Sequence, residues 1–157
     1  MIGSPVVDPF NLDPIAAEDA ADLAETARRL LAELDRDVVR AATLSAECRP
    51  PLDVVETAST IEILIDVPGV PSDSLRVAIR REAILVVGAK LPPASEPGAR
   101  FHLAERSYGR FARAVRIGGA VDAGRARGVV TSGQLRIVLP RIDERRGAVL
   151  RVPVDPA

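Results

Sequence analysis

The sequence predicts an antiparallel β-sandwich with a helical arm before it and a flexible extension after it. Apolar residues recur at helical spacing in the first third of the chain, and then alternate in several short runs. Turn-forming residues separate these runs about every ten residues, which is typical of a sandwich. At 157 residues the chain has the length of about one domain. We expect an arm over 1–50, the sandwich over 51–140 and the extension over 141–157.

The arm is predicted to contain a helix over residues 14–46. Asp13 before Pro14 is a typical helix start, and Pro50-Pro51 ends the pattern. A helix with one apolar side packs against another surface, either of its own domain or of a partner chain. The apolar positions that would share one side are Leu23, Ala27, Leu30, Leu31, Leu34, Val38 and Ala42.

After Pro51 the apolar pattern changes to a period of two, which predicts strands. The segments "TIEILIDVPGV", "SLRVAIRR" and "RFARAVRI" alternate in this way. The segment "AILVVGA" is apolar at successive positions, as in a central strand. Ser132-Gly133 is a plausible turn between "GVVTS" and "QLRIVLP", and the Pro-rich "LPPASEPG" predicts a loop that leaves the domain.

The charges are distributed unevenly. Residues 1–73 hold 15 acidic and 5 basic residues, whereas residues 74–157 hold 7 acidic and 16 basic ones. This asymmetry can indicate binding to nucleic acid or to a membrane surface. The arginines are scattered and not interleaved with aromatics, so an acidic arm lying against a basic body is the preferred interpretation. We expect no nucleic-acid partner and no membrane partner.

Candidate catalytic groups gather only in "RFHLAERSYGRF", which holds His102, Glu105, Ser107 and Tyr108. Nucleophilic catalysis by Ser107 would need His102 within hydrogen-bond reach, but residues five apart in a strand lie about 17 Å apart and face opposite ways. Phosphate-loop, dinucleotide and zinc-protease motifs are absent from the sequence. We therefore expect no enzymatic activity, no cofactor and no metal, and interpret His102 as a partly exposed strand residue.

Cys48 is the single cysteine, so no internal disulfide can form. This fits a reducing compartment, and no secretory signal pattern is visible at the N-terminus. We predict a cytoplasmic protein.

Four segments, in order, resemble the small heat shock proteins, which share the α-crystallin domain. They are "LDVVETASTIEILIDVPGV", "ILVVGAK", "ERSYGRFARAVRI" and "GQLRIVLPR". The resemblance covers about residues 51–140, and a weaker similarity extends into the tail. The matching motif residues are Pro68, Gly69, Val70, Gly88, Glu105, Arg106, Gly109, Phe111, Arg113, Gly133, Leu135, Leu139 and Pro140.

The resemblance implies an immunoglobulin-like sandwich that dimerises and forms larger homo-oligomers. It also implies ATP-independent binding of unfolding client proteins under stress. A strand swap between partners would use Phe101 and Leu103, in the loop over residues 89–104. The tail Val152-Pro153-Val154 would dock in a groove of a neighbouring domain, with Leu150-Arg151-Val152 as an overlapping alternative. We expect Val77, Ile79 and Val130 to line that groove.

Clients would bind the arm, at Phe10, Leu23, Leu30, Leu31, Leu34 and Val38. The main alternative is a co-chaperone-like interaction module that does not itself hold clients, because the α-crystallin sandwich resembles such a domain. RNA or acidic-membrane binding through the arginine-rich body is a third possibility and predicts strong salt dependence. Enzymatic activity is the fourth and least favoured possibility.

Overall fold

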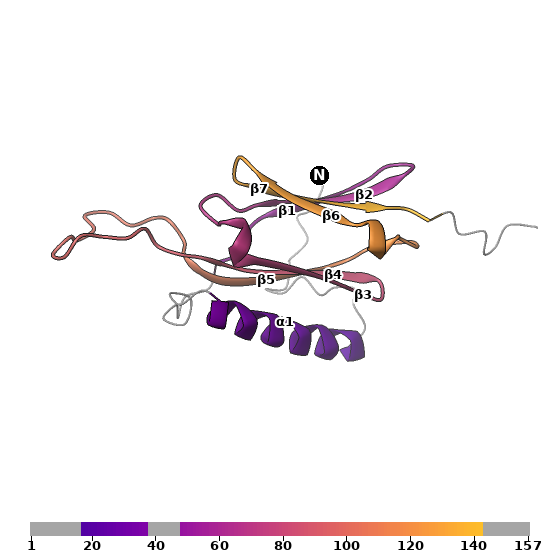
Figure 1. Ribbon diagram of the computed structural model, residues 1–157, viewed down its shortest axis with the longest axis horizontal. Coiled ribbons are helices and arrows are strands. Elements are labelled where there is room, and N and C mark those ends of the chain that lie inside the picture. Colours follow the sequence, from indigo (N-terminus) through magenta and orange to yellow (C-terminus); the bar gives the residue numbers. More distant parts are fainter. Residues whose placement is uncertain (1–16, 38–47, 143–157) are drawn as a thin grey trace, which may run out of the picture.

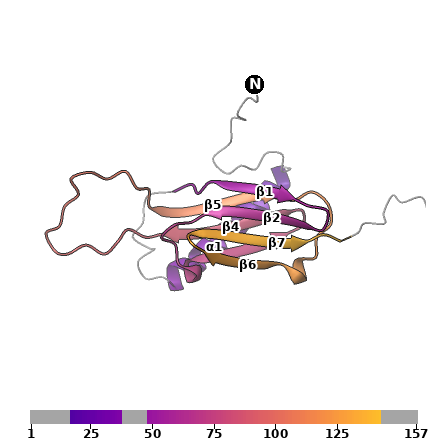
Figure 2. The same ribbon diagram turned by 90° about the horizontal axis from the view of Figure 1, so that it is seen from above.

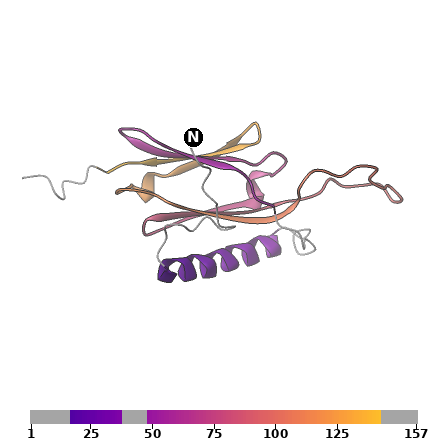
Figure 3. The same cartoon turned by 180° about the vertical axis from the view of Figure 1, so that it is seen from behind.

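The computed structural model describes residues 17–37 and 48–142, which form a helix and two stacked antiparallel sheets (Figure 1). The helix covers the outer face of one sheet, and the inner faces of the two sheets enclose the core (Figure 3). This arrangement confirms the predicted β-sandwich with a helix in its N-terminal arm.

One sheet has four strands in the order β1-β2-β7-β6, and the other has three in the order β3-β4-β5. All neighbouring strands are antiparallel. The strands are β1 (Leu52–Glu56), β2 (Thr60–Asp66), β3 (Leu75–Arg80), β4 (Ala83–Lys90), β5 (Gly109–Arg116), β6 (Arg127–Thr131) and β7 (Gln134–Pro140).

The core between the sheets is aliphatic apart from one ring. Alternate residues of β2 and β7 point inward, as their period of two predicts, and Phe111 of β5 is 4% exposed among them. The most deeply buried members are Ile61, Ile63, Ile65, Val67, Ile84, Val86, Ile117, Ile137 and Leu139.

Ser132 and Gly133 form the two-residue turn between β6 and β7, so this prediction is confirmed. Thr131 pairs with Gln134, and the two turn residues have φ of 51° and 76°. Positive φ at both central positions gives the type of turn that matches the twist of a hairpin. The backbone N–H of Val67 donates to the Gly133 carbonyl at 2.7 Å, which ties the turn to the end of β2.

The helix α1 (Ala17–Asp37) lies within the predicted span of 14–46. The proposed start at Asp13-Pro14 and residues 38–46 fall outside the described residues. Leu23, Ala27 and Leu34 face the β3-β4-β5 sheet and pack against its outer face. The apolar side of the helix therefore covers its own domain, one of the two alternatives that the sequence left open.

Strand β4 explains why the run "AILVVGA" is apolar at successive positions. Ile84 and Val86 point into the core between the sheets, whereas Leu85 and Val87 point to α1. Each of these four side chains is at most 3% exposed. The strand is central in its sheet and covered on both faces, as its composition predicts.

Any side chain at the position of Gly88 in β4 should destabilise the fold. A Cβ there would lie 2.4 Å from Phe111 Cζ and 2.9 Å from Leu75 Cδ2, both in buried side chains. We expect Gly88→Ala to lower the free energy of unfolding by about 1–3 kcal/mol, because the core must shift. Gly118, which has open space around its Cα, provides the control Gly118→Ala. Equal denaturation midpoints for the two variants would contradict this account.

Candidate interaction surfaces

The segment between β4 and β5 is a long loop that projects beyond the sandwich (Figure 2). His102 lies in this loop and is exposed, so its interpretation as a strand residue was wrong within the single chain. The pattern Phe101-His102-Leu103 alternates like a strand, but none of the strands that the structure describes pairs with it. Ser107 is also exposed, and His102 makes no hydrogen bond to it within the described residues. The structure thus brings together no nucleophile and base here.

The base of the loop is organised around Tyr108. Lys90 Nζ lies 6.0 Å and Arg106 Cζ 5.2 Å from the centroid of the tyrosine ring, within the range of cation–π attraction. Glu105 and Arg106 form no ion pair with any residue that the structure describes. Arg106 thus contacts the aromatic ring of Tyr108.

Arg113 of β5 is a structural residue of the core. It is 6% exposed, and its guanidinium donates to the carbonyl of Pro50. Burial lowers the pKa of Arg113, and Arg49 lowers it further through charge repulsion. The side chain ties the segment before β1 to the opposite sheet, so it fixes where the arm enters the sandwich.

Cys48 lies at a cavity of about 360 Å³ together with Lys90, Ser107 and Phe111. Burial raises the pKa of the Cys48 thiol, although Lys90 opposes the shift. The thiol donates to the Gly109 carbonyl at 3.5 Å. Because a raised pKa reduces the thiolate fraction, the cysteine is suited to packing and not to nucleophilic chemistry.

The edge of the four-stranded sheet at β1 is one candidate surface for a partner. Among the described strands β1 pairs only with β2, so its other side is an edge of the sheet. Val54 and Val55 are 45% and 44% exposed. In the loop, Phe101 and Leu103 are 68% and 75% exposed, the two most exposed large apolar side chains among the described residues. A single chain thus exposes both segments that a strand addition would join, namely the β1 edge and the loop around Phe101 and Leu103.

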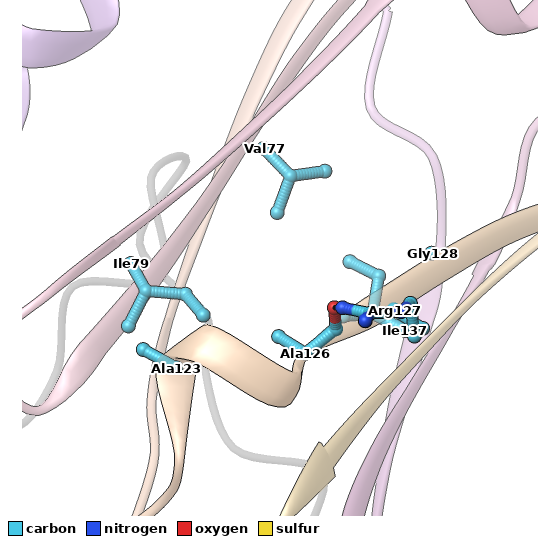
Figure 4. A pocket seen from close by; sticks show the side chains of 7 residues that line it. All are labelled: Val77, Ile79, Ala123, Ala126, Arg127, Gly128 and Ile137. Atoms are coloured by element: carbon cyan, nitrogen blue, oxygen red, sulfur yellow. Dashed lines mark hydrogen bonds between the residues drawn. The ribbon is translucent and has the colours of Figure 1, made fainter.

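A second surface is a cavity of about 460 Å³ between the edges of the two sheets, next to the short 3₁₀ helix η3 (Ala123–Arg125). Val77 and Ile79 of β3 line one side, and the η3–β6 segment lines the other (Figure 4). Its full lining is Val77, Ile79, Ala123, Ala126, Arg127, Gly128 and Ile137. We call this cavity the edge groove.

Gly128 lines the groove without contributing a side chain to it. A Cβ at this position would lie 3.7 Å from Leu135 Cδ1 and 3.9 Å from Ile137 Cγ1, in ordinary contact, so a larger residue would fit there and fill the space. Val130, which the sequence assigned to the lining, is half-buried against the core and does not line the groove. Val130 was assigned to the lining because an apolar pattern points to large residues, whereas Gly128 lines the groove without a side chain.

A third surface lies hidden beneath α1. Leu23 and Leu34 are 4% and 1% exposed against Leu85, Val87 and their neighbours. Leu30 and Leu31 are half-buried at its margin. The predicted client-binding residues of the arm are therefore covered by the chain's own sheet wherever the structure describes them. Phe10, Val38, Val152 and Val154 lie outside the described residues.

Ion pairs join one end of the helix to the hairpin between β3 and β4. Asp22 pairs with Arg80, and Asp19 pairs with Arg81. These contacts place acidic groups of the arm on basic groups of the body, as the uneven charge distribution predicts. Their side chains are 33–67% exposed, so solvent screens the pairs and each contributes little alone.

Within residues 17–37 and 48–142, no group of three histidine, cysteine, aspartate or glutamate residues is arranged to hold a metal ion. α1 is too polar to cross a membrane, and the described part of the chain holds no other long helix.

The accessible β1 edge, the edge groove and the apolar face beneath α1 are the candidate interaction surfaces of this sandwich. The family model for the Hsp20/alpha crystallin family matches residues 53–155, and the chain belongs to that family. The family consists of non-enzymatic chaperones of the stress response, in agreement with the prediction that this chain is not an enzyme.

Curated relatives agree with this assignment. The 18.9 kDa heat shock protein of Oryza sativa is 31% identical over 104 residues, which cover 66% of this chain and 59% of the relative. The peroxisomal 16.0 kDa heat shock protein of the same species is 31% identical over 62% of this chain and 71% of its own length. Spore protein SP21 of Stigmatella aurantiaca is 30% identical over 60% of this chain and 56% of its own. The chain spans about half to three fifths of the length of several curated relatives that it matches, among them the 18.9 kDa protein and SP21.

Solved structures share the fold. Heat shock protein 16.0 from Schizosaccharomyces pombe superposes with a TM-score of 0.60 at 22% identity, covering 69% of this chain and all of that one. The hspA protein from Xanthomonas axonopodis gives a TM-score of 0.56 at 25% identity, covering 61% of this chain and 96% of that one.

Proposed function

We propose that this chain is an ATP-independent holdase, which binds unfolding proteins and keeps them from aggregating. The observation that carries the proposal is the covered apolar interface between α1 and the β3-β4-β5 sheet. A holdase needs apolar surface that is covered at rest and available on demand. Binding of the unfolded state then competes with aggregation by mass action. Family membership supports the same conclusion, because the family's chaperones generally work without ATP.

The interface is suited to opening without unfolding of the sandwich. Burial of Leu23 and Leu34 contributes about 1.5–3 kcal/mol each, which the entropy of ordering the helix offsets in part. Release of α1 would expose its leucines together with Leu85 and Val87 of β4. The core between the two sheets, built from other residues, would remain closed.

Charge reversal at Asp22 tests this mechanism without removing any apolar surface. In Asp22→Arg, the new arginine would face Arg80 and loosen the helix. We expect the variant to suppress light scattering of a heat-labile client, with no nucleotide present, at a several-fold lower ratio of chaperone to client than the wild type. Glu25→Arg is the matched control, because Glu25 is 74% exposed and pairs only with Arg28 on α1.

Hydrogen exchange of the α1 amides would verify that the helix is loosened. A loosened helix with unchanged client protection would place the client surface elsewhere. A wild-type protein that fails to protect clients at any ratio would exclude the holdase. That result would favour the alternative, a co-chaperone-like interaction module.

We further propose that the chain dimerises by strand exchange. The segment around Phe101 and Leu103 would add to the β1 edge of a partner, with main-chain hydrogen bonds for affinity and alternate side chains for register. The exposure of both side chains and of the β1 edge supports this arrangement.

Deletion of residues 91–104 should give folded monomers. Lys90 pairs with Gly109 at the end of the β4-β5 ladder, so the remaining residues 105–108 would close a four-residue hairpin loop. Sedimentation velocity would report the mass, and circular dichroism would report the fold. Phe101→Ser with Leu103→Ser keeps the loop length and should have the same effect. Dimers that persist in both variants would locate the interface elsewhere.

We also propose that the tail Val152-Pro153-Val154 docks in the edge groove of a neighbouring subunit. Residues two apart in an extended segment face the same way, and Val77 and Ile79 repeat that spacing on the groove wall. Pro153 presets an extended backbone and loses no ladder hydrogen bond.

A larger side chain at position 128 should therefore fill the edge groove and prevent the tail from docking there. In Gly128→Val the added methyl groups occupy the cavity, while the new Cβ makes only ordinary contacts. We expect an unchanged or higher melting temperature and an assembly that shrinks towards dimers, measured by light scattering at low micromolar concentration. Val129→Thr, on the outward face of the same strand, is the control. A folded Gly128→Val protein of wild-type size would contradict docking in this groove.

A further inference from the structure

The edge groove has one charged side chain in its lining, that of Arg127. Its Nη1 donates to the Ala126 carbonyl at 2.7 Å, which places the guanidinium beside Ala126 (Figure 4). Arg127 is exposed and makes no ion pair with any residue that the structure describes. A guanidinium has five N–H donors, so most of them remain available to a carboxylate.

Among the residues that the structure describes, no acidic side chain forms an ion pair with Arg127. The acidic residue nearest in sequence is Asp122, whose carboxylate accepts a hydrogen bond from the backbone N–H of Arg125 at 3.3 Å and so caps η3. Arg125 adds a second exposed cation in the segment that leads to the groove. The rim of an otherwise apolar groove is thus positively charged.

The two candidate tail motifs differ in the charges that they bring to this rim. Asp155 directly follows Val154, so the motif Val152-Pro153-Val154 carries an acid at its end. The overlapping motif Leu150-Arg151-Val152 carries Arg151 at its centre and would bring like charge to Arg127. In an extended segment Asp155 points away from the groove floor, towards the rim, when Val154 points inward.

We infer that Arg127 recognises the carboxylate of Asp155 from a second copy of this chain, and thereby selects the Val152–Val154 register of the tail. The occupant of the groove is the segment from Val152 to Asp155, an apolar pair followed by one acid. The inference rests on the proposed docking of the tail and adds the residue that determines its register. The Arg127–Asp155 contact also fixes the direction in which the tail runs along the groove, because Arg151 and Asp155 flank the motif at opposite ends.

The expected effect is modest, because an exposed ion pair changes an equilibrium by only about two- to five-fold. It is measurable as the concentration at which the full-length assembly dissociates to dimers, followed by mass photometry through a dilution series. Arg127→Glu and Asp155→Arg should each raise this midpoint several-fold. The double variant, which restores an opposite pair, should return it to near the wild-type value.

Controls separate this inference from the docking on which it rests. Asp143→Arg makes the same charge change in the same tail, nine residues before Val152, and should have no effect. Val154→Ala should weaken assembly while Leu150→Ala should not. If Val152→Ala with Val154→Ala disrupts assembly but the charge variants do not, docking stands and the role of Arg127 is refuted. A double charge variant that fails to recover also refutes it. If the valine substitutions have no effect, the docking proposal itself is wrong.

Discussion

The burial of β4 on both faces is the constraint on which the rest of the structure depends. One face of this strand closes the core between the sheets, and the other needs a cover that the sandwich itself does not provide. The helix α1 supplies that cover, so the arm and the sandwich are parts of one folded unit at rest. Gly88 adds to the constraint from within β4, since it leaves the space that Phe111 fills. A change in β4 therefore affects the core and the helix together.

The same architecture leaves its strand edges open. Two stacked sheets that do not close into a barrel have edge strands, which among the described residues are β1 and β6 in one sheet and β3 and β5 in the other. Exposed edges are a liability in a protein that stays alone, but they are binding sites in one that assembles. The β1 edge offers backbone groups for strand addition, whereas the groove between β3 and β6 offers a cavity for side chains. The two edges thus favour different kinds of contact, and neither competes with α1 for surface.

Much of the fold could be predicted from the sequence, because alternation and turn residues are local signals. The central position of β4 and the Ser132-Gly133 turn are examples. The packing of α1 could not be predicted, since an apolar stripe does not specify which surface it meets. His102 was misplaced because its neighbours alternate as in a strand that has no partner within one chain. Val77 and Ile79, which the sequence singled out, line the cavity that we propose for the tail. Gly128 and Arg127 also line it but were missed, because a glycine has no side chain to give a signal and Arg127 resembles the other scattered arginines.

Electrostatics orients the helix α1 on the sheet but contributes little to how firmly it is held. The pairs Asp22–Arg80 and Asp19–Arg81 join the helix to the body at one end only, and both are partly exposed. Salt at physiological strength screens such charges beyond about 8–10 Å, so the pairs orient the helix more than they anchor it. Most of the docking energy must then come from the buried leucines, and the entropy of ordering the helix offsets part of it. The helix is thus held by residues of a small apolar cluster, separate from the larger core between the two sheets.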